Sequence, residues 1–195
     1  ALMFNRDAMR RAGLVDAEGT VTPPRTWDAL RSAVRKLTIV QRRSDGVQMT
    51  LERWFELTPS ARQADGRFVL DTRLAELKTV GFIPMYGNSW LYMFGWMNGG
   101  EFVSDDGRRV TLNAPEIVAA LEWVKEIYDE MGGYGAVQSF QAGFQGGALD
   151  PFISGRVAMK IDGYWQMNHL GQFAREVDFG IDTPPMPQHM IDRGV

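Results

Sequence analysis

Short, mainly apolar runs recur along the chain, and each has the length of a strand. The runs 80–86 and 157–161 are bounded by Gly, Asn or Asp, which is typical of strands that are buried on both faces. The apolar opening 1–4 and the run 177–181 predict two further short strands.

Apolar residues spaced three to four apart predict helices between these runs. In 27–37, Leu30, Val34 and Leu37 form one apolar face, and Thr26 is suited to cap the start of the helix. The same reasoning predicts further helices over 6–12, 90–97, 113–131, 149–154 and 164–173. Strands that alternate with helices favour an α/β fold in which helices cover a mixed sheet.

The remaining segments carry mainly turn residues. Residues 38–76 combine turn signals with a mixed stretch around Trp54, and both a hairpin and an inserted helix fit that segment. The Gly- and Gln-rich stretch 135–147 predicts an ordered loop, and 105–107 predicts the turn of a small hairpin. The prolines within 184–187 are expected to end regular structure.

Composition excludes several classes of site. The 195 residues include 45% hydrophobic and 23% charged residues, no cysteine and two histidines. A disulfide framework, a thiolate zinc site and an iron–sulfur cluster are therefore excluded, and no metal or other cofactor is expected. The formal net charge of −3 argues against a nucleic-acid partner held by phosphate neutralisation. Small molecules or proteins are the expected partners.

Three groups of segments carry a resemblance to a known family. They are 1–7 with 12–14 and 23–30, 96–100 with 113–116, and 152–165 with 177–180 and 184–187; they contain the motifs Thr-Trp-Asp-Ala-Leu, Trp-Met-Asn-Gly-Gly and Met-Lys-Ile-Asp-Gly-Tyr-Trp. In this order they resemble the extracellular solute-binding proteins of bacterial ABC importers, in particular the carbohydrate-binding group similar to maltose-binding protein.

The resemblance implies a periplasmic-binding-protein-like fold with two lobes and a ligand in the cleft between them. Residues 1–188 would form most of the helix-rich second lobe, with a possible insertion at 41–79, and 189–195 would begin the return toward the other lobe. The resemblance implies a protein that captures its solute outside the cytoplasm and delivers it to the transmembrane subunits of an ABC permease, and a monomer is expected. A signal or lipoprotein peptide upstream of residue 1 is therefore expected.

The turn between the strand 157–161 and the next helix holds the first group of candidate ligand residues. Trp165 presents a large flat ring on which a sugar can stack, and the matching tryptophan of the family does so in several members. Gly163 allows close approach of the backbone, and Tyr164 offers a hydroxyl to a ligand. The competing interpretation is that Trp165 anchors the core.

Asn88, Ser89 and Trp90 form the second group of candidates. They follow the strand 80–86, and α/β proteins tend to place ligand contacts at the carboxyl ends of strands. A cap or core role competes for Asn88 and Trp90, and Tyr92 and Trp96 are expected in the core. Phe144 and Gln145 are expected in a surface loop rather than in the cleft.

An enzyme and an interaction module remain as alternatives to a sugar receptor that performs no chemistry. Carboxylate groups at 126–130 and 105–106 have the chemistry of a sugar hydrolase, but they are expected on an exposed helix face and a turn tip. His169 has no partner of the required type nearby in the sequence. The same fold would also suit a non-sugar solute, and exposed Trp90 and Trp165 would suit a flat protein interface.

Overall fold

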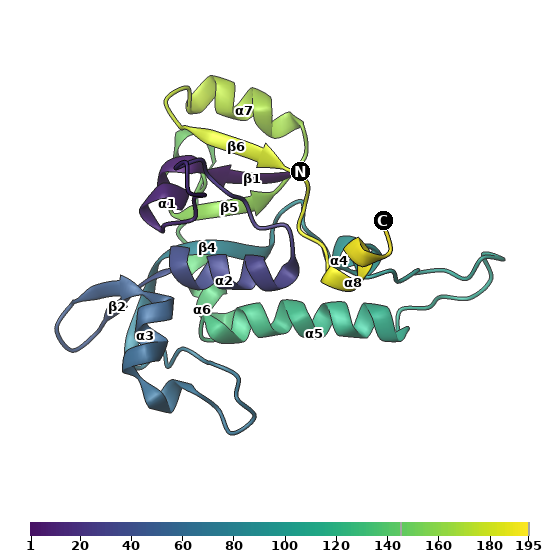
Figure 1. Ribbon diagram of the computed structural model, residues 1–195, viewed down its shortest axis with the longest axis horizontal. Coiled ribbons are helices and arrows are strands. Elements are labelled where there is room, and N and C mark those ends of the chain that lie inside the picture. Colours follow the sequence, from purple (N-terminus) through teal and green to yellow (C-terminus); the bar gives the residue numbers. More distant parts are fainter. Residues whose placement is uncertain (145, 195) are drawn as a thin grey trace.

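The computed structural model describes residues 1–144 and 146–194, in which strands and helices alternate along the chain (Figure 1). The strands are β1 (Leu2–Asn5), β2 (Ile39–Arg42), β3 (Gln48–Thr50), β4 (Ala75–Gly87), β5 (Val157–Ile161) and β6 (Phe179–Asp182). The helices are α1 (Arg6–Arg11), α2 (Trp27–Leu37), α3 (Leu51–Leu57), α4 (Leu91–Met97), α5 (Pro115–Glu130), α6 (Tyr134–Gln141), α7 (Trp165–Phe173) and α8 (Gln188–Asp192). Short 3₁₀ turns occupy Pro59–Ala61 and Gly147–Leu149.

The strands form a mixed sheet in the order β3-β2-β4-β5-β1-β6. β4 and β5 run parallel, and the other neighbouring pairs are antiparallel. Leu2 and Gly87 both pair with Ile161. The start of β1 and the carboxyl ends of β4 and β5 therefore lie together. We call residues 87–90 and 161–165 at this place the carboxyl edge.

Helices cover both faces of the sheet. Side chains alternate along a strand, so Leu2 and Phe4 join one core cluster with Leu30 of α2, whereas Met3 joins a second cluster with Leu170 of α7. Figure 1 shows α7 on one side of the strands and α2 and α5 on the other. The β5 residues are buried throughout, which explains the mainly apolar run that predicts this strand.

Aromatic stacking and hydrogen bonds link α2 to α5 and to the segment after β6. The Thr26 side chain caps α2 by accepting a hydrogen bond from the Ala29 amide at 3.0 Å. The Trp27 ring stacks on Trp123 of α5 with 4.4 Å between ring centroids. Its indole nitrogen donates to the Pro185 carbonyl at 3.0 Å, which fixes the segment after β6 against α2.

The predicted strands and most of the predicted helices are confirmed, with ends shifted by a few residues. The region 38–76 contains both of the open alternatives, the hairpin β2–β3 and the helix α3, and β4 already begins at Ala75. The helix predicted over 113–131 begins two residues later, at Pro115, and its N-cap residue Ala114 makes no side-chain bond.

The small hairpin predicted around 105–107 is confirmed, because an antiparallel bridge joins Val103 to Val110 across that turn. Three other local predictions were wrong. The stretch 135–147 contains most of α6, since Val137 and Phe140 are buried at helical spacing despite the glycines around them. The helix expected over 149–154 does not form, and α8 follows the prolines that were expected to end regular structure.

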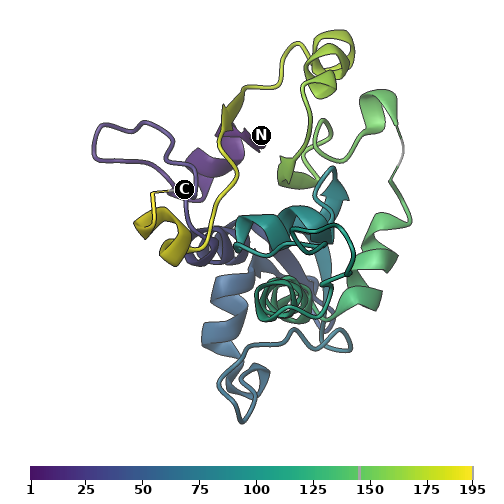
Figure 2. The ribbon, with the colours of Figure 1, turned by 90° about the vertical axis from the view of Figure 1, so that its right-hand side faces the viewer.

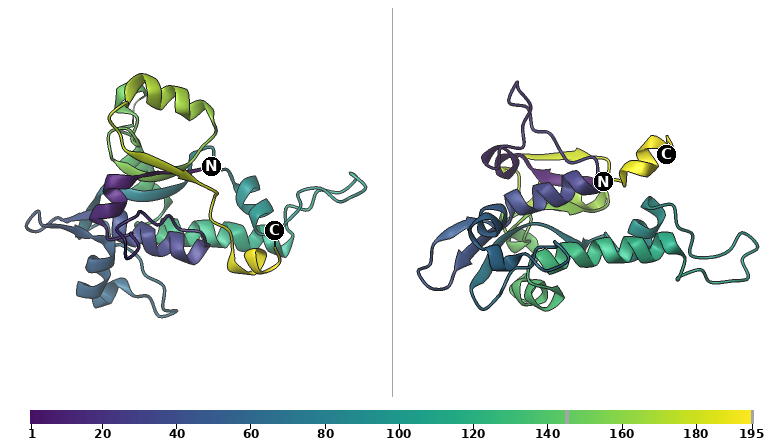
Figure 3. Two further views of the ribbon diagram at one scale, coloured as in Figure 1. Left: turned by 45° about the horizontal axis from the view of Figure 1, so that its top comes forward. Right: turned by 60° about the horizontal axis from the view of Figure 1, so that its bottom comes forward.

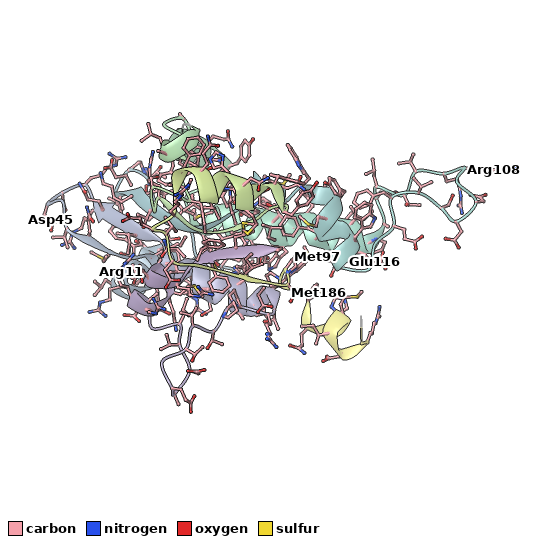
Figure 4. All side chains as sticks on the ribbon, turned by 90° about the horizontal axis from the view of Figure 1, so that it is seen from above. Arg11, Asp45, Met97, Arg108, Glu116 and Met186 are labelled. Atoms are coloured by element: carbon pink, nitrogen blue, oxygen red, sulfur yellow. The ribbon has the colours of Figure 1, made fainter. Side chains whose placement is uncertain are left out.

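Residues 101–114 extend from the body of the molecule as an arm, with Arg108 near its tip (Figures 3 and 4). The arm lies beyond the first turn of α5 (Figure 3), and Met190 of α8 lies against Gly99 after α4. Across the described ranges, the helices are too short or too polar to cross a membrane.

Candidate functional site

The carboxyl edge brings the two predicted groups of ligand residues together (Figure 2). The backbone N–H of Asn88 donates a hydrogen bond to the Ile161 carbonyl at 2.9 Å, so the loop after β4 is tied to the loop after β5. Gly87 permits this approach, because a Cβ at Gly87 would lie 2.6 Å from the Ile161 oxygen. The sequence separates these loops by more than 70 residues, and the parallel pairing of β4 and β5 joins them.

Gly163, Tyr164 and Trp165 form a tight turn into α7. The indole ring of Trp165 folds back over Gly163, where a Cβ would overlap the ring atoms Cη2, Cζ3 and Cζ2. Trp165 is 50% exposed and Tyr164 is 83% exposed, and their rings meet edge to face at 5.7 Å. An aromatic surface therefore faces solvent at the end of β5, as an apolar platform for a ligand requires.

The loop after β4 adds one aromatic ring and one amide to this edge. Trp90 is 52% exposed at the N-cap of α4, and the Asn88 side chain is half-buried. Ser89 is 1% exposed, and its hydroxyl donates to the Tyr86 carbonyl at 2.9 Å. In this structure Ser89 shapes the turn rather than offering its hydroxyl to solvent.

The prediction that Tyr92 and Trp96 lie in the core was wrong. Both are exposed, and Trp96 meets Tyr92 and Phe102 of the arm edge to face. Phe94 and Gly95 form the buried face of α4 instead, with Phe94 against Trp27 and Trp123. Helical spacing alone does not say which of two apolar faces is covered.

The glycine-rich loop gives a mixed outcome. Phe144 is half-buried and packs edge to face against Tyr86 at 5.7 Å, below the carboxyl edge. Gln145 lies outside the described residues.

The carboxylates considered for a hydrolase are held elsewhere. The prediction that Glu130 lies on an exposed face was wrong, because it is fully buried and bonded to Arg31 at 2.5 Å and to Arg35 at 2.6 Å. Glu126 bonds Arg31 at 2.7 Å. These pairs join α5 to α2 at the end of α5 away from the arm, far along the helix from the carboxyl edge (Figure 1).

The other candidate groups are likewise separate from the edge. The Ser104 hydroxyl lowers the pKa of Asp106 by a hydrogen bond in the arm. His169 lies on α7 with its ring 5.0 Å from the ring of Phe173. Within the described ranges, no three His, Asp or Glu side chains gather as metal ligands would.

A buried charged cluster beneath the carboxyl edge was missed from the sequence. Lys160 of β5 is 2% exposed, and its ammonium lies 3.0 Å from the Asp162 carboxylate and 3.9 Å from Asp150. The Tyr86 hydroxyl donates to Asp150 at 3.2 Å. Burial and the nearby Asp150 carboxylate raise the pKa of Tyr86, which keeps this hydroxyl protonated as a donor. A lysine inside an otherwise apolar strand is the signal that points to such a cluster.

The sequence pattern and the fold agree with a known family. The family model described as bacterial extracellular solute-binding protein matches residues 1–192. The chain belongs to this family. Among curated protein sequences, none matches this solute-binding chain.

Solved structures of sugar-binding proteins share the fold of the solute-binding chain. CpMnBP1 with mannobiose bound is similar with a TM-score of 0.68 at 26% identity, over 95% of this chain and 38% of that one. The maltose/maltodextrin-binding domain MalE from Bdellovibrio bacteriovorus, bound to maltotriose, has a TM-score of 0.55 at 17% identity, and the match covers 96% of this chain and 37% of that one. A solute-binding protein from Thermotoga lettingae bound with alpha-D-tagatose has a TM-score of 0.59 at 18% identity, and the match covers 95% of this chain and 38% of that one. The solute-binding chain thus spans less than two-fifths of the length of each.

Proposed function

We propose that the solute-binding chain forms one wall of a carbohydrate-binding cleft, and that an oligosaccharide is its ligand. The observation that carries this proposal is the exposure of the aromatic side chains Trp165, Tyr164 and Trp90 at the carboxyl edge. Flat rings pack against the C–H faces of sugars, and each such contact removes apolar area from water. The mannobiose, maltotriose and tagatose complexes of the similar structures support the same ligand class.

The charge of the carboxyl edge also supports a neutral ligand. Asp162, an acidic side chain of this edge, is 7% exposed and bonded to Lys160. The groups exposed there are aromatic rings and the half-buried Asn88 amide, which can both donate to and accept from a polyol. A polyamine or a phosphodiester would need an opposite charge that these side chains do not present.

In this proposal residues 1–188 are the second lobe of the protein, and the opposing lobe supplies the other wall. The share of the similar structures that the chain spans supports this division. Closure of the two lobes around the sugar would present the protein to the transmembrane subunits of an ABC permease outside the cytoplasm. The receptor itself performs no chemistry, and we expect it to act as a monomer.

Isothermal titration calorimetry on the full-length protein tests the proposal, with mannobiose, maltotriose and laminaribiose as sugars and spermidine as a charged solute. We expect one sugar to bind, and Trp165→Ala to weaken it by about 10- to 70-fold, because removing roughly 50–100 Å² of apolar contact costs about 1.3–2.5 kcal/mol. Tyr134→Ala is the matched control, since Tyr134 is an exposed aromatic residue at the start of α6. Binding of spermidine alone, or equal loss in both variants, would contradict the proposal.

A further inference from the structure

Lys160 is a buried cation that the sugar contacts described above do not use. Its side chain is 3% exposed, in the penultimate position of β5. A buried ammonium is costly unless it is paired and hydrogen-bonded. Lys160 is paired with Asp162 at 3.0 Å, and its ammonium also lies over the rings of Tyr86 and Phe152, at 5.4 and 5.8 Å from their centroids.

The partners of Lys160 come from three separate segments. Asp162 follows β5, Tyr86 lies near the end of β4, and Asp150 precedes β5 in the segment that leads from α6. Asp150 also accepts hydrogen bonds from the Phe152 and Ile153 amides at 2.9 and 3.2 Å, and from the Tyr86 hydroxyl. One ammonium therefore holds three segments together beneath the carboxyl edge.

Each of two partners reaches a proposed ligand residue through one more bond. The second carboxylate oxygen of Asp162 accepts from the Gly163 amide at 2.8 Å, and Gly163 is the residue beneath the Trp165 ring. The Tyr86 carbonyl accepts from the Ser89 hydroxyl, which fixes the turn before Trp90. Trp165 and Trp90 thus stand on turns that the charged cluster holds.

We propose that Lys160 is a positioning residue for sugar binding, which holds the turns under Trp165 and Trp90 in their binding conformation without touching the ligand. This inference rests on the proposed function of the carboxyl edge. A platform that is already ordered avoids the cost of ordering side chains and loops on binding. Lys160 is therefore expected to affect affinity through Trp165 and not only the stability of the fold.

A double-mutant cycle tests this route. We expect Lys160→Met, which keeps the long apolar stem, to weaken sugar binding at least tenfold in the full-length protein. In a Trp165→Ala background the same substitution should change affinity less than threefold, because the ring that it positions is absent. Equal effects in the two backgrounds, or an unchanged affinity for Lys160→Met, would overturn the proposal.

A control and a second variant separate positioning from folding. Glu130→Gln breaks another buried ion pair, at the far end of α5, and should lower stability while affinity changes less than twofold. If Lys160→Met does not fold, Lys160→Met with Asp162→Asn removes both charges and leaves an amide oxygen to accept from Gly163. This double variant should bind more tightly than Asp162→Ala, in which no acceptor remains, and equal or weaker binding would contradict the proposed route through Gly163.

Hydrogen exchange on the ligand-free protein gives a readout that does not depend on the sugar. Lys160→Met should speed exchange of the amides in 88–90 and 163–166 at least tenfold, while amides of α2 change little. If no sugar binds the wild-type protein, the proposed function fails, and this measurement still decides whether Lys160 holds the two turns. Uniform acceleration in both regions would show a general loss of stability and would overturn the positioning role.

Discussion

Gly163 lies directly beneath the indole ring of Trp165, so that a Cβ at position 163 would overlap three atoms of that ring. The contact also explains why Trp165 remains half-exposed at the start of α7 rather than turning into the core. The orientation of the proposed platform thus depends on a hydrogen atom in place of a side chain.

We expect Gly163→Ala to displace the Trp165 ring. Ligand affinity should fall at least tenfold, while the free energy of unfolding should change by less than about 1 kcal/mol, because the half-exposed ring can move into solvent. Calorimetric titration and urea unfolding measure the two effects.

Gly171→Ala is the control for that substitution. Gly171 lies in the same helix, and a Cβ there would meet no atom within 4 Å. Replacing a helical glycine by alanine should stabilise the protein by about 0.5–1 kcal/mol without loss of affinity. If both variants lose affinity to the same extent, the contact between Gly163 and Trp165 is not the cause.

The strands and the candidate loops were predictable because their signals are local. The apolar runs of β4 and β5 give the strands, and the turn residues after them give Asn88 and Gly163. The parallel order of these strands then places both loops at one edge, which the general placement of ligands in α/β proteins anticipates.

The errors concern relations between distant residues. The pairing of Glu130 with Arg31 and Arg35 depends on the packing of α5 against α2, and a helical pattern with a glutamate predicts only a solvated face. The charged cluster of Lys160 likewise joins residues from three segments. The exposed face of α4 depends on the arm beside it, since Trp96 meets Phe102. None of these contacts between distant residues is signalled by a repeating pattern of residues along the sequence.

Glu130 makes a prediction about stability that does not involve the ligand. Glu130→Ala leaves two guanidinium groups without their buried carboxylate partner, so the free energy of unfolding should fall by about 3–5 kcal/mol. Urea unfolding measures this loss. The control is Glu56→Ala, which breaks an exposed pair with Arg53 on α3 and should cost less than about 1 kcal/mol. Similar losses in the two variants would show that the pairing of α2 with α5 adds little.

Tyr128 predicts how stability changes at alkaline pH. Burial raises the pKa of Tyr128 to about 12, although the hydrogen bond from the Met85 amide favours the phenolate. In the unfolded chain a tyrosine has a pKa of about 10. A pKa that is raised by folding contributes stability that is fully present below about pH 10 and is lost as the pH rises towards 12.

We therefore expect the free energy of unfolding to fall across this range, and to fall less steeply in Tyr128→Phe. Urea unfolding at several pH values measures the slope, and Tyr92→Phe is the control, because Tyr92 is an exposed tyrosine on α4 that does not contact Tyr128. Equal slopes in wild type and Tyr128→Phe would show that this hydroxyl does not contribute to the alkaline loss.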